Sequence, residues 1–246
     1  MSAEIDAASS AFGFFYVVGH GIEAGVVEPL VESGRRFFAA EEAVKRCIRP
    51  GTPSRGPTLL PDVPGFREPV LDYVRSLTGL GHKLMAMIAR GLRLPDSYFV
   101  DRYTGDPSTS FRIFNYPQVE DGVLADDFPQ TPTFADPGFL ALMTQDGSGG
   151  LEVKCQGRWF DVPDMPGSFF CNVGEALARL TNHRYVAAQH RVRSSAQNHR
   201  LSMQFSFCPA LNAVLEPIAT VAPATPREIT GNTASVFQKR THRHLG

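Results

Sequence analysis

The stretch that decides the fold is GLEVKCQGRWFDVPDMPGSFFCNVGEALARLTNHRYVAAQHRV, residues 150–192, followed by RLSMQFSFCP at residues 200–209. Apolar and polar residues alternate over residues 151–155 and again along the second segment, which is the pattern of half-buried β-strands. Gln156-Gly157 and Pro166-Gly167 mark turns between such strands. Short strands separated by Gly and Pro turns indicate a mainly β architecture of the sandwich or barrel type.

Two residues of the last strand carry chemistry. Arg200 and Ser202 are two positions apart, so their side chains point to the same face of the strand. A guanidinium fork beside a hydroxyl group suits a buried carboxylate, although an Arg at a strand edge is more often solvated. His190 is a further candidate, although a single His is more often structural than catalytic.

The order of residues from Pro166 to Ser202 resembles a known family. The run PGSFFCNVGEALARLTNHRYVAAQHRV, followed by an Arg-x-Ser strand, is similar to the iron(II)- and 2-oxoglutarate-dependent dioxygenases of the isopenicillin N synthase-like group. The resemblance implies a mainly β fold with flanking helices, whose core is a distorted double-stranded β-helix (jelly roll). It also implies that His190 binds the metal and that Arg200 and Ser202 hold the far carboxylate of 2-oxoglutarate.

The resemblance continues upstream, where it meets an anomaly. FRIFNYP resembles a family strand whose Tyr reaches the co-substrate, which makes Tyr116 a candidate for that contact; a Tyr simply packed at a strand end fits equally well. TFADPGFLALMTQD resembles an H-x-D-x-G segment followed by an apolar strand and Gln-Asp. This match places Asp136 on the carboxylate ligand and Phe134 where the first metal-binding His is expected.

The substitution at position 134 has a physical cost for metal binding. A two-His-one-carboxylate triad holds ferrous iron on one face and leaves positions for co-substrate and oxygen. Phe134 has no lone pair, so Asp136 and His190 remain as the implied protein ligands. The other histidines offer no ready replacement: the family gives His20 a structural place, and His183 lies in a turn with poor geometry. We expect the rest to face solvent, namely His82, His199, His242 and His244.

Composition limits the range of functions. The chain has 246 residues, 43% of them hydrophobic, and a net charge of −1, so nothing in its charge favours nucleic acid or an anionic membrane surface. No apolar run approaches the ~18 residues of a membrane span, and the N-terminus has acids where a signal peptide needs bases. Four scattered Cys residues indicate thiols in a core rather than disulfides. We therefore expect a cytoplasmic protein with a small organic substrate.

The predicted organisation is one domain over residues 1–246. It comprises a mixed α/β region at 1–100, a jelly-roll core at 101–210 and a C-terminal extension at 211–246. The N-terminal region should contain a buried strand at 11–18 and amphipathic helices at 23–46 and 67–93. The Pro- and Gly-rich connection between the helices, residues 50–66, is shorter than the family usually has.

Three interpretations follow. The first is a non-haem Fe(II)- and 2-oxoglutarate-dependent oxygenase that oxidises a small organic molecule. The second is a metal-poor, non-redox relative that binds a ligand or partner, which Phe134 favours. The third is that the sequence lacks or alters a native His. The sequence determines neither the substrate, nor the type of oxidation, nor the oligomeric state.

Overall fold

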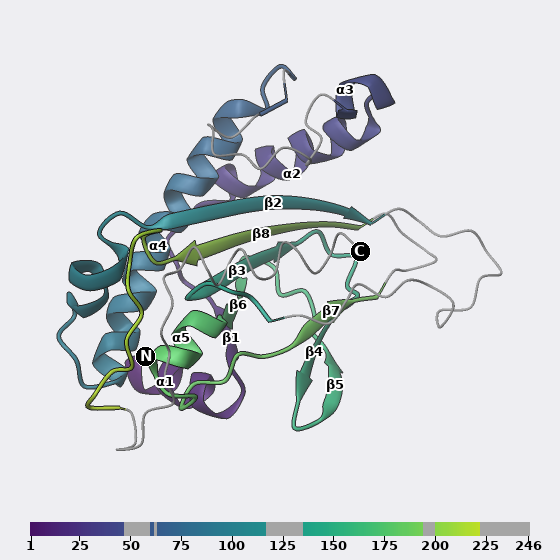
Figure 1. Cartoon of the computed structure of the whole chain (residues 1–246). Coiled ribbons are helices and arrows are strands. Elements are labelled where there is room, and N and C mark those ends of the chain that lie inside the picture. Colours follow the sequence, from purple (N-terminus) through teal and green to yellow (C-terminus); the bar gives the residue numbers. More distant parts are fainter. Residues whose placement is uncertain (47–59, 62, 117–134, 194–199, 222–246) are drawn as a thin grey trace.

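Two antiparallel sheets form the centre of the protein. The computed structural model describes residues 1–46, 60–61, 63–116, 135–193 and 200–221. The larger sheet has the strand order β1-β6-β3-β8-β2 and the smaller sheet the order β5-β4-β7 (Figure 1). In chain order the strands are β1 (Phe14–Val17), β2 (Ser108–Tyr116), β3 (Leu140–Gln145), β4 (Leu151–Cys155), β5 (Arg158–Asp161), β6 (Phe169–Val173), β7 (His190–Val192) and β8 (Arg200–Cys208).

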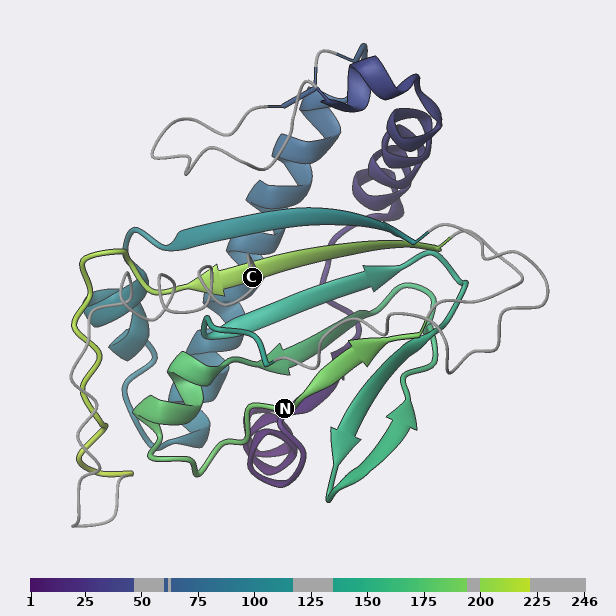
Figure 2. The same ribbon diagram turned by 45° about the vertical axis from the view of Figure 1, so that its right-hand side comes forward.

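Helix α4 runs along the side of the large sheet that lies away from the small one (Figure 2). The helices of the described residues are α1 (Ser2–Ala11), α2 (Ala24–Ala39), α3 (Glu42–Arg46), α4 (Arg67–Gly91), the π-helix η1 (Val100–Thr104) and α5 (Glu175–Leu180). The long helix α4 contacts β8 directly, and α1 and α2 pack against α4. None of the helices in the described ranges is both long and apolar enough to cross a membrane.

The alternation predicted for the last strand separates two apolar layers. Leu201, Met203, Phe205 and Phe207 are buried in the cluster between the large sheet and the helices. A second cluster lies between the sheets, where Met143 and Phe170 of the large sheet meet Val153 of the small one. Because side chains alternate across a strand, the polar residues of β8 face this second layer. The fold therefore places Arg200 and Ser202 between the two sheets.

The structure confirms most predicted strands and corrects two elements of the N-terminal third. The expected strand at 11–18 is only β1, which is half-buried, because Ala11 still belongs to the unpredicted helix α1. The expected helix at 23–46 is interrupted at Ala40, whose extended backbone (ψ 163°) ends α2 before α3 begins. The expected helix at 67–93 is α4, and most of the 50–66 connection lies outside the described residues.

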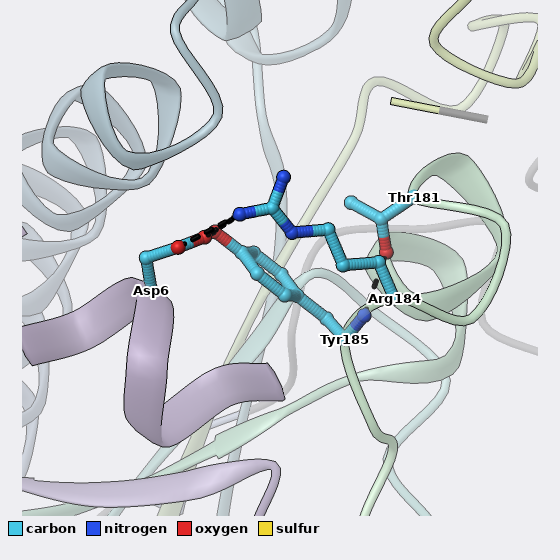
Figure 3. A network of polar contacts seen from close by, with 4 residues as sticks. All are labelled: Asp6, Thr181, Arg184 and Tyr185. Carbon is cyan, nitrogen blue, oxygen red and sulfur yellow. Dashed lines mark hydrogen bonds and ion pairs between the residues drawn. The ribbon is translucent and has the colours of Figure 1, made fainter. Parts of the chain in front are cut away.

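A polar network joins α1 to the segment that follows α5 (Figure 3). Arg184 Nη2 donates to both carboxylate oxygens of Asp6 at 2.8 Å, and the Tyr185 hydroxyl donates to Asp6 at 2.6 Å. The Tyr185 backbone N–H donates to Thr181 Oγ1 at 3.2 Å. Tyr185 is fully buried, so its hydroxyl needs this partner, and the network fixes the N-terminal helix against the core.

Candidate active site

Asp136 and His190 are brought together from segments far apart in the chain. Asp136 lies just before β3 and is 1% exposed; His190 opens β7 and is 2% exposed. His190 Nδ1 lies 3.9 Å from Asp136 Oδ2. The two residues that the sequence proposed as metal ligands are therefore buried neighbours.

The start of α5 holds Asp136 in place. The Glu175 N–H donates to the Asp136 carbonyl oxygen at 2.7 Å. Gly174, the residue before α5, is packed so closely on this segment that a Cβ there would lie 2.0 Å from the Gly138 carbonyl oxygen. The backbone from Asp136 to Gly138 is thus fixed by contact with one helix end.

Two side-chain amides bind the Asp136 carboxylate. Asn172, in the middle of β6, lies with Nδ2 3.4 Å from Asp136 Oδ2 and 3.1 Å from His190 Nδ1. Gln204, in the middle of β8, lies with Nε2 2.5 Å from Asp136 Oδ1. Neither residue was predicted from the sequence. The available signal was their position as polar residues within apolar strands, and for Gln204 its spacing from Arg200 and Ser202.

The electrostatics of this cluster suit a cation. Within the described residues no Lys or Arg pairs with Asp136, although a buried carboxylate normally has a cationic partner or binds a metal. A carboxylate, an imidazole and amide groups form an N/O donor set of the kind that ferrous iron accepts. The described residues contain no group of three His, Cys, Asp or Glu side chains placed to hold a metal. The donors present fit Fe(II), and Phe134 lies outside the described residues.

Arg200 forms the second part of the site. It is 2% exposed, and its Nη2 donates to Gln145 Oε1 at 3.2 Å. Its guanidinium carbon lies 4.9 Å from the centre of the Tyr116 ring. Nε and Nη1 are buried and have no hydrogen-bond partner among the described residues, and burial lowers the pKa of the guanidinium from its ordinary value. Two unfilled donors on a buried cation fit an anionic ligand.

Ser202 and Tyr116 lie beside Arg200. Ser202 is 5% exposed and is paired across the sheet with Gln145 on one side and Phe114 on the other. Tyr116 is the register partner of Arg200. Burial raises the pKa of the Tyr116 hydroxyl, while the Arg200 charge lowers it, so the group remains a protonated donor at neutral pH. The structure places all three predicted co-substrate residues in one polar group.

A carboxylate anchors the first residues of β8. Asp146 Oδ2 accepts a hydrogen bond from the Leu201 N–H at 2.8 Å, and Asp146 Oδ1 accepts one from the Ser148 hydroxyl at 2.6 Å. Asp164 lies close enough to Asp146 and Arg200 to interact with their charges, and burial raises the pKa of its carboxyl group. Asp146 thus fixes the backbone next to Arg200 without taking the free donors of the guanidinium.

The remaining histidines mostly have structural places. His20 Nε2 lies 3.0 Å from the Gly167 carbonyl oxygen, and His20 Nδ1 accepts from the Ile22 N–H at 3.0 Å. His183 is exposed, with a left-handed backbone (φ 62°) in the turn after α5. The expectation that His82 faces solvent is wrong, because it is half-buried with its ring 5.1 Å from that of Phe207 where α4 approaches β8. His199, His242 and His244 lie outside the described residues.

Comparison with solved structures identifies the fold. The chain superposes with a TM-score of 0.85 and 20% identity on a full-length Neurospora crassa protein in complex with 2-oxoglutarate and thymine, covering 99% of this chain and 91% of that one. A 2OG-Fe(II) oxygenase family protein of Caulobacter crescentus gives a TM-score of 0.86 at 21% identity, covering 98% and 93%. The predicted double-stranded β-helix is confirmed.

Comparison of sequences identifies the family. Residues 102–209 match the 2OG-Fe(II) oxygenase superfamily, and residues 1–60 match the N-terminal region described as non-haem dioxygenase in morphine synthesis. A probable iron/ascorbate oxidoreductase of Dictyostelium discoideum is 30% identical over 277 aligned positions, which cover 87% of this chain and 76% of the relative. The chain therefore belongs to the superfamily of 2-oxoglutarate- and Fe(II)-dependent oxygenases, as an enzyme of the dioxygenase type.

Proposed function

We propose that Asp136 and His190 bind Fe(II) and that Arg200, Ser202 and Tyr116 bind the far carboxylate of 2-oxoglutarate. The observation that carries this assignment is the pair of buried donors on Arg200, Nε and Nη1, that no described residue satisfies. A carboxylate can accept from both in a charge-assisted contact. The hydroxyl groups of Ser202 and Tyr116 supply neutral donors at the same position.

The two halves of the proposed site lie along one face of β8. Arg200, Ser202 and Gln204 are every second residue of the strand and therefore lie on that face, and Gln204 contacts Asp136. Arg200 and Gln204 are four positions apart, which corresponds to roughly 13 Å along a strand. The long Arg200 side chain covers part of that distance. In the proposed arrangement, one carboxylate of 2-oxoglutarate contacts the Arg200 guanidinium and the other end of the molecule faces the Asp136–His190 pair.

In the proposed mechanism, the protein's own residues bind and orient the metal and shield the site from water. When bound, the iron supplies the oxidative chemistry that no side chain can perform. Asp136 and His190 hold it, and Asn172 orients both through its side-chain amide. The apolar layer between the sheets, which includes Met143, Phe170 and Val153, keeps bulk water from the buried polar groups.

We propose a small organic substrate. The Neurospora crassa protein and JOX2, which share this fold, hold thymine and JA respectively together with 2-oxoglutarate. In this chain the rings of Phe114 and Tyr116 are stacked at 6.2 Å, and they lie on the same face of β2 next to Arg200. Such an aromatic surface suits a planar or partly apolar molecule.

The decisive experiment is calorimetric titration of 2-oxoglutarate into the Co(II)-loaded protein without oxygen. Arg200→Ala removes a charge-assisted contact and should weaken binding by about 2 kcal/mol, or about 30-fold. Arg158→Ala, at an exposed position of β5, is the matched control and should bind like the parent. Equal 2-oxoglutarate affinity in Arg200→Ala and the parent would refute the assignment. Succinate formation by the Fe(II)-loaded parent separates an oxygenase from a non-redox binding protein.

A further inference from the structure

We infer that Gln204 supplies the third protein donor to the metal, through its side-chain amide oxygen. The inference rests on the proposed function of Asp136 and His190 as ligands, and concerns the position left open by the Phe at residue 134. Its starting point is one contact: the Gln204 amide meets Asp136 Oδ1, whereas Asn172 meets Oδ2. Each oxygen of the Asp136 carboxylate is thus next to one side-chain amide. The Asn172 amide also contacts His190, whereas the Gln204 amide is available for a ligand role.

The position of Gln204 favours a role toward a ligand. It is half-buried, while its strand neighbours Met203 and Phe205 are fully buried on the other face of β8. Its cross-strand partners are Arg112 on β2 and Met143 on β3. Gln204 is therefore the more exposed of the two amides that contact Asp136, whereas Asn172 is fully buried.

The amide group can serve both states of the site. Its NH₂ end donates to the Asp136 carboxylate in the structure. Rotation of the amide by half a turn exchanges nitrogen and oxygen at nearly the same positions. A cation held by Asp136 repels the NH₂ end and attracts the carbonyl oxygen. Gln204 is thereby prepared to complete an Asp–His–Gln set of protein donors.

Asp136 is already positioned by Asn172, so Gln204 is available for a second role. The Asn172 amide already contacts both Asp136 Oδ2 and His190 Nδ1, which fixes the two side chains relative to one another. The Glu175 N–H fixes the Asp136 backbone. A ligand role and a positioning role predict opposite effects when the Gln204 amide becomes a carboxylate, and this provides the test.

The test compares Gln204→Leu and Gln204→Glu by calorimetric titration with Co(II), by the visible absorption of bound Co(II), and by thermal melts with and without the metal. Gln204→Leu removes the donor and should weaken Co(II) binding by about 10-fold or more, with a changed spectrum. Gln204→Glu provides an oxygen donor with charge and should bind Co(II) at least as tightly as the parent. Without metal it should melt at a lower temperature, because two carboxylates then face one another.

The controls separate this inference from the proposed function. Gln189→Glu adds the same charge at an exposed position beside His190 and should leave Co(II) binding and its spectrum unchanged. Parent-like binding and spectrum in Gln204→Leu would overturn the role of Gln204 and leave Asp136 and His190 as ligands. Weaker binding in Gln204→Glu than in Gln204→Leu would show that Gln204 only positions Asp136, and would also overturn it. A parent that binds no Co(II) overturns the proposed function together with this inference.

Discussion

At the scale of the residue, the candidate site is defined by buried charged groups that lack a partner of opposite charge or leave hydrogen-bond donors unsatisfied among the described residues. Among the residues that the structure describes, Asp136 is a buried carboxylate held by amides rather than by an Arg or Lys, and Arg200 is a buried cation with two donors that no partner satisfies. Each arrangement costs free energy in the empty protein and returns it when a ligand of opposite charge binds. On the proposed assignment, some stability of the ligand-free protein is given up so that a cation site at Asp136 and an anion site at Arg200 are already formed.

The residue-scale prediction concerns Phe134→His. If position 134 corresponds to the first metal-binding His of the family, the new imidazole should tighten Fe(II) binding by more than about 10-fold, since imidazole is a better iron donor than an amide oxygen. The metal-free variant should be less stable than the parent, because it carries a polar nitrogen without a partner, and Fe(II) should reverse the difference. Anaerobic melts with and without Fe(II) measure both effects. No gain in iron-dependent stability and no gain in succinate formation would remove position 134 from the site.

At the scale of the element, α4 shows how one helix can contain two Gly residues with opposite roles. Gly81 is buried where α4 packs on β8, and a Cβ there would lie 2.6 Å from the Phe207 ring. Gly79 is exposed, and a Cβ there would meet nothing within 4 Å. Both weaken the helix relative to Ala, but only Gly81 allows the helix to approach the sheet.

The element-scale prediction compares Ala at these two positions. Gly79→Ala should raise the free energy of unfolding by up to about 1 kcal/mol, because Ala has the higher helix propensity. Gly81→Ala should lower it by about 1–3 kcal/mol, because the methyl group collides with Phe207 and the buried core cannot yield without strain. Urea unfolding curves of the two variants and the parent measure the difference. Equal effects of the two substitutions would show that α4 does not pack on β8 through Gly81.

At the scale of the whole molecule, folding buries a thiol and a phenol group, those of Cys208 and Tyr103. Burial raises the pKa of Cys208 to about 12 from 9.0, with a smaller contribution from the Asp136 charge. Burial also raises the pKa of Tyr103 to about 12 from 10.0. In the unfolded chain these groups ionise at their ordinary values, so the two states differ in bound protons only at alkaline pH.

We therefore predict alkaline destabilisation. Below the ordinary pKa of Cys208, 9.0, both groups are neutral in the folded and unfolded states, and they do not change stability with pH. As the pH rises from there toward about 12, the unfolded state releases protons that the folded state retains, so the free energy of unfolding falls. Urea midpoints measured in steps from about pH 8 to about pH 11 test this slope. Cys208→Ala should show a shallower fall, and a midpoint that does not change with pH would contradict the prediction.

Much of the candidate site could be predicted from the sequence alone, because the patterns that indicate it are local. Alternation predicted that Arg200 and Ser202 share one face of a strand, and the order of motifs indicated the family and made Asp136 and His190 the candidate metal ligands. Local patterns failed where packing decides: α2 ends at Ala40 despite continuous periodicity, and α1 was not predicted.

The tertiary structure decided which polar groups meet. Gln204 and Asp136 are 68 positions apart, and Asn172 and Asp136 are 36 apart. Their contacts follow from the strand order β6-β3-β8. This order places β3, with Asp136 just before it, between Asn172 of β6 and Gln204 of β8. That no described residue pairs with two of the Arg200 donors is likewise a property of the packed sheets. Periodicity specifies the face on which a side chain lies, but strand order and register specify its neighbours, and these are set only when the whole core packs.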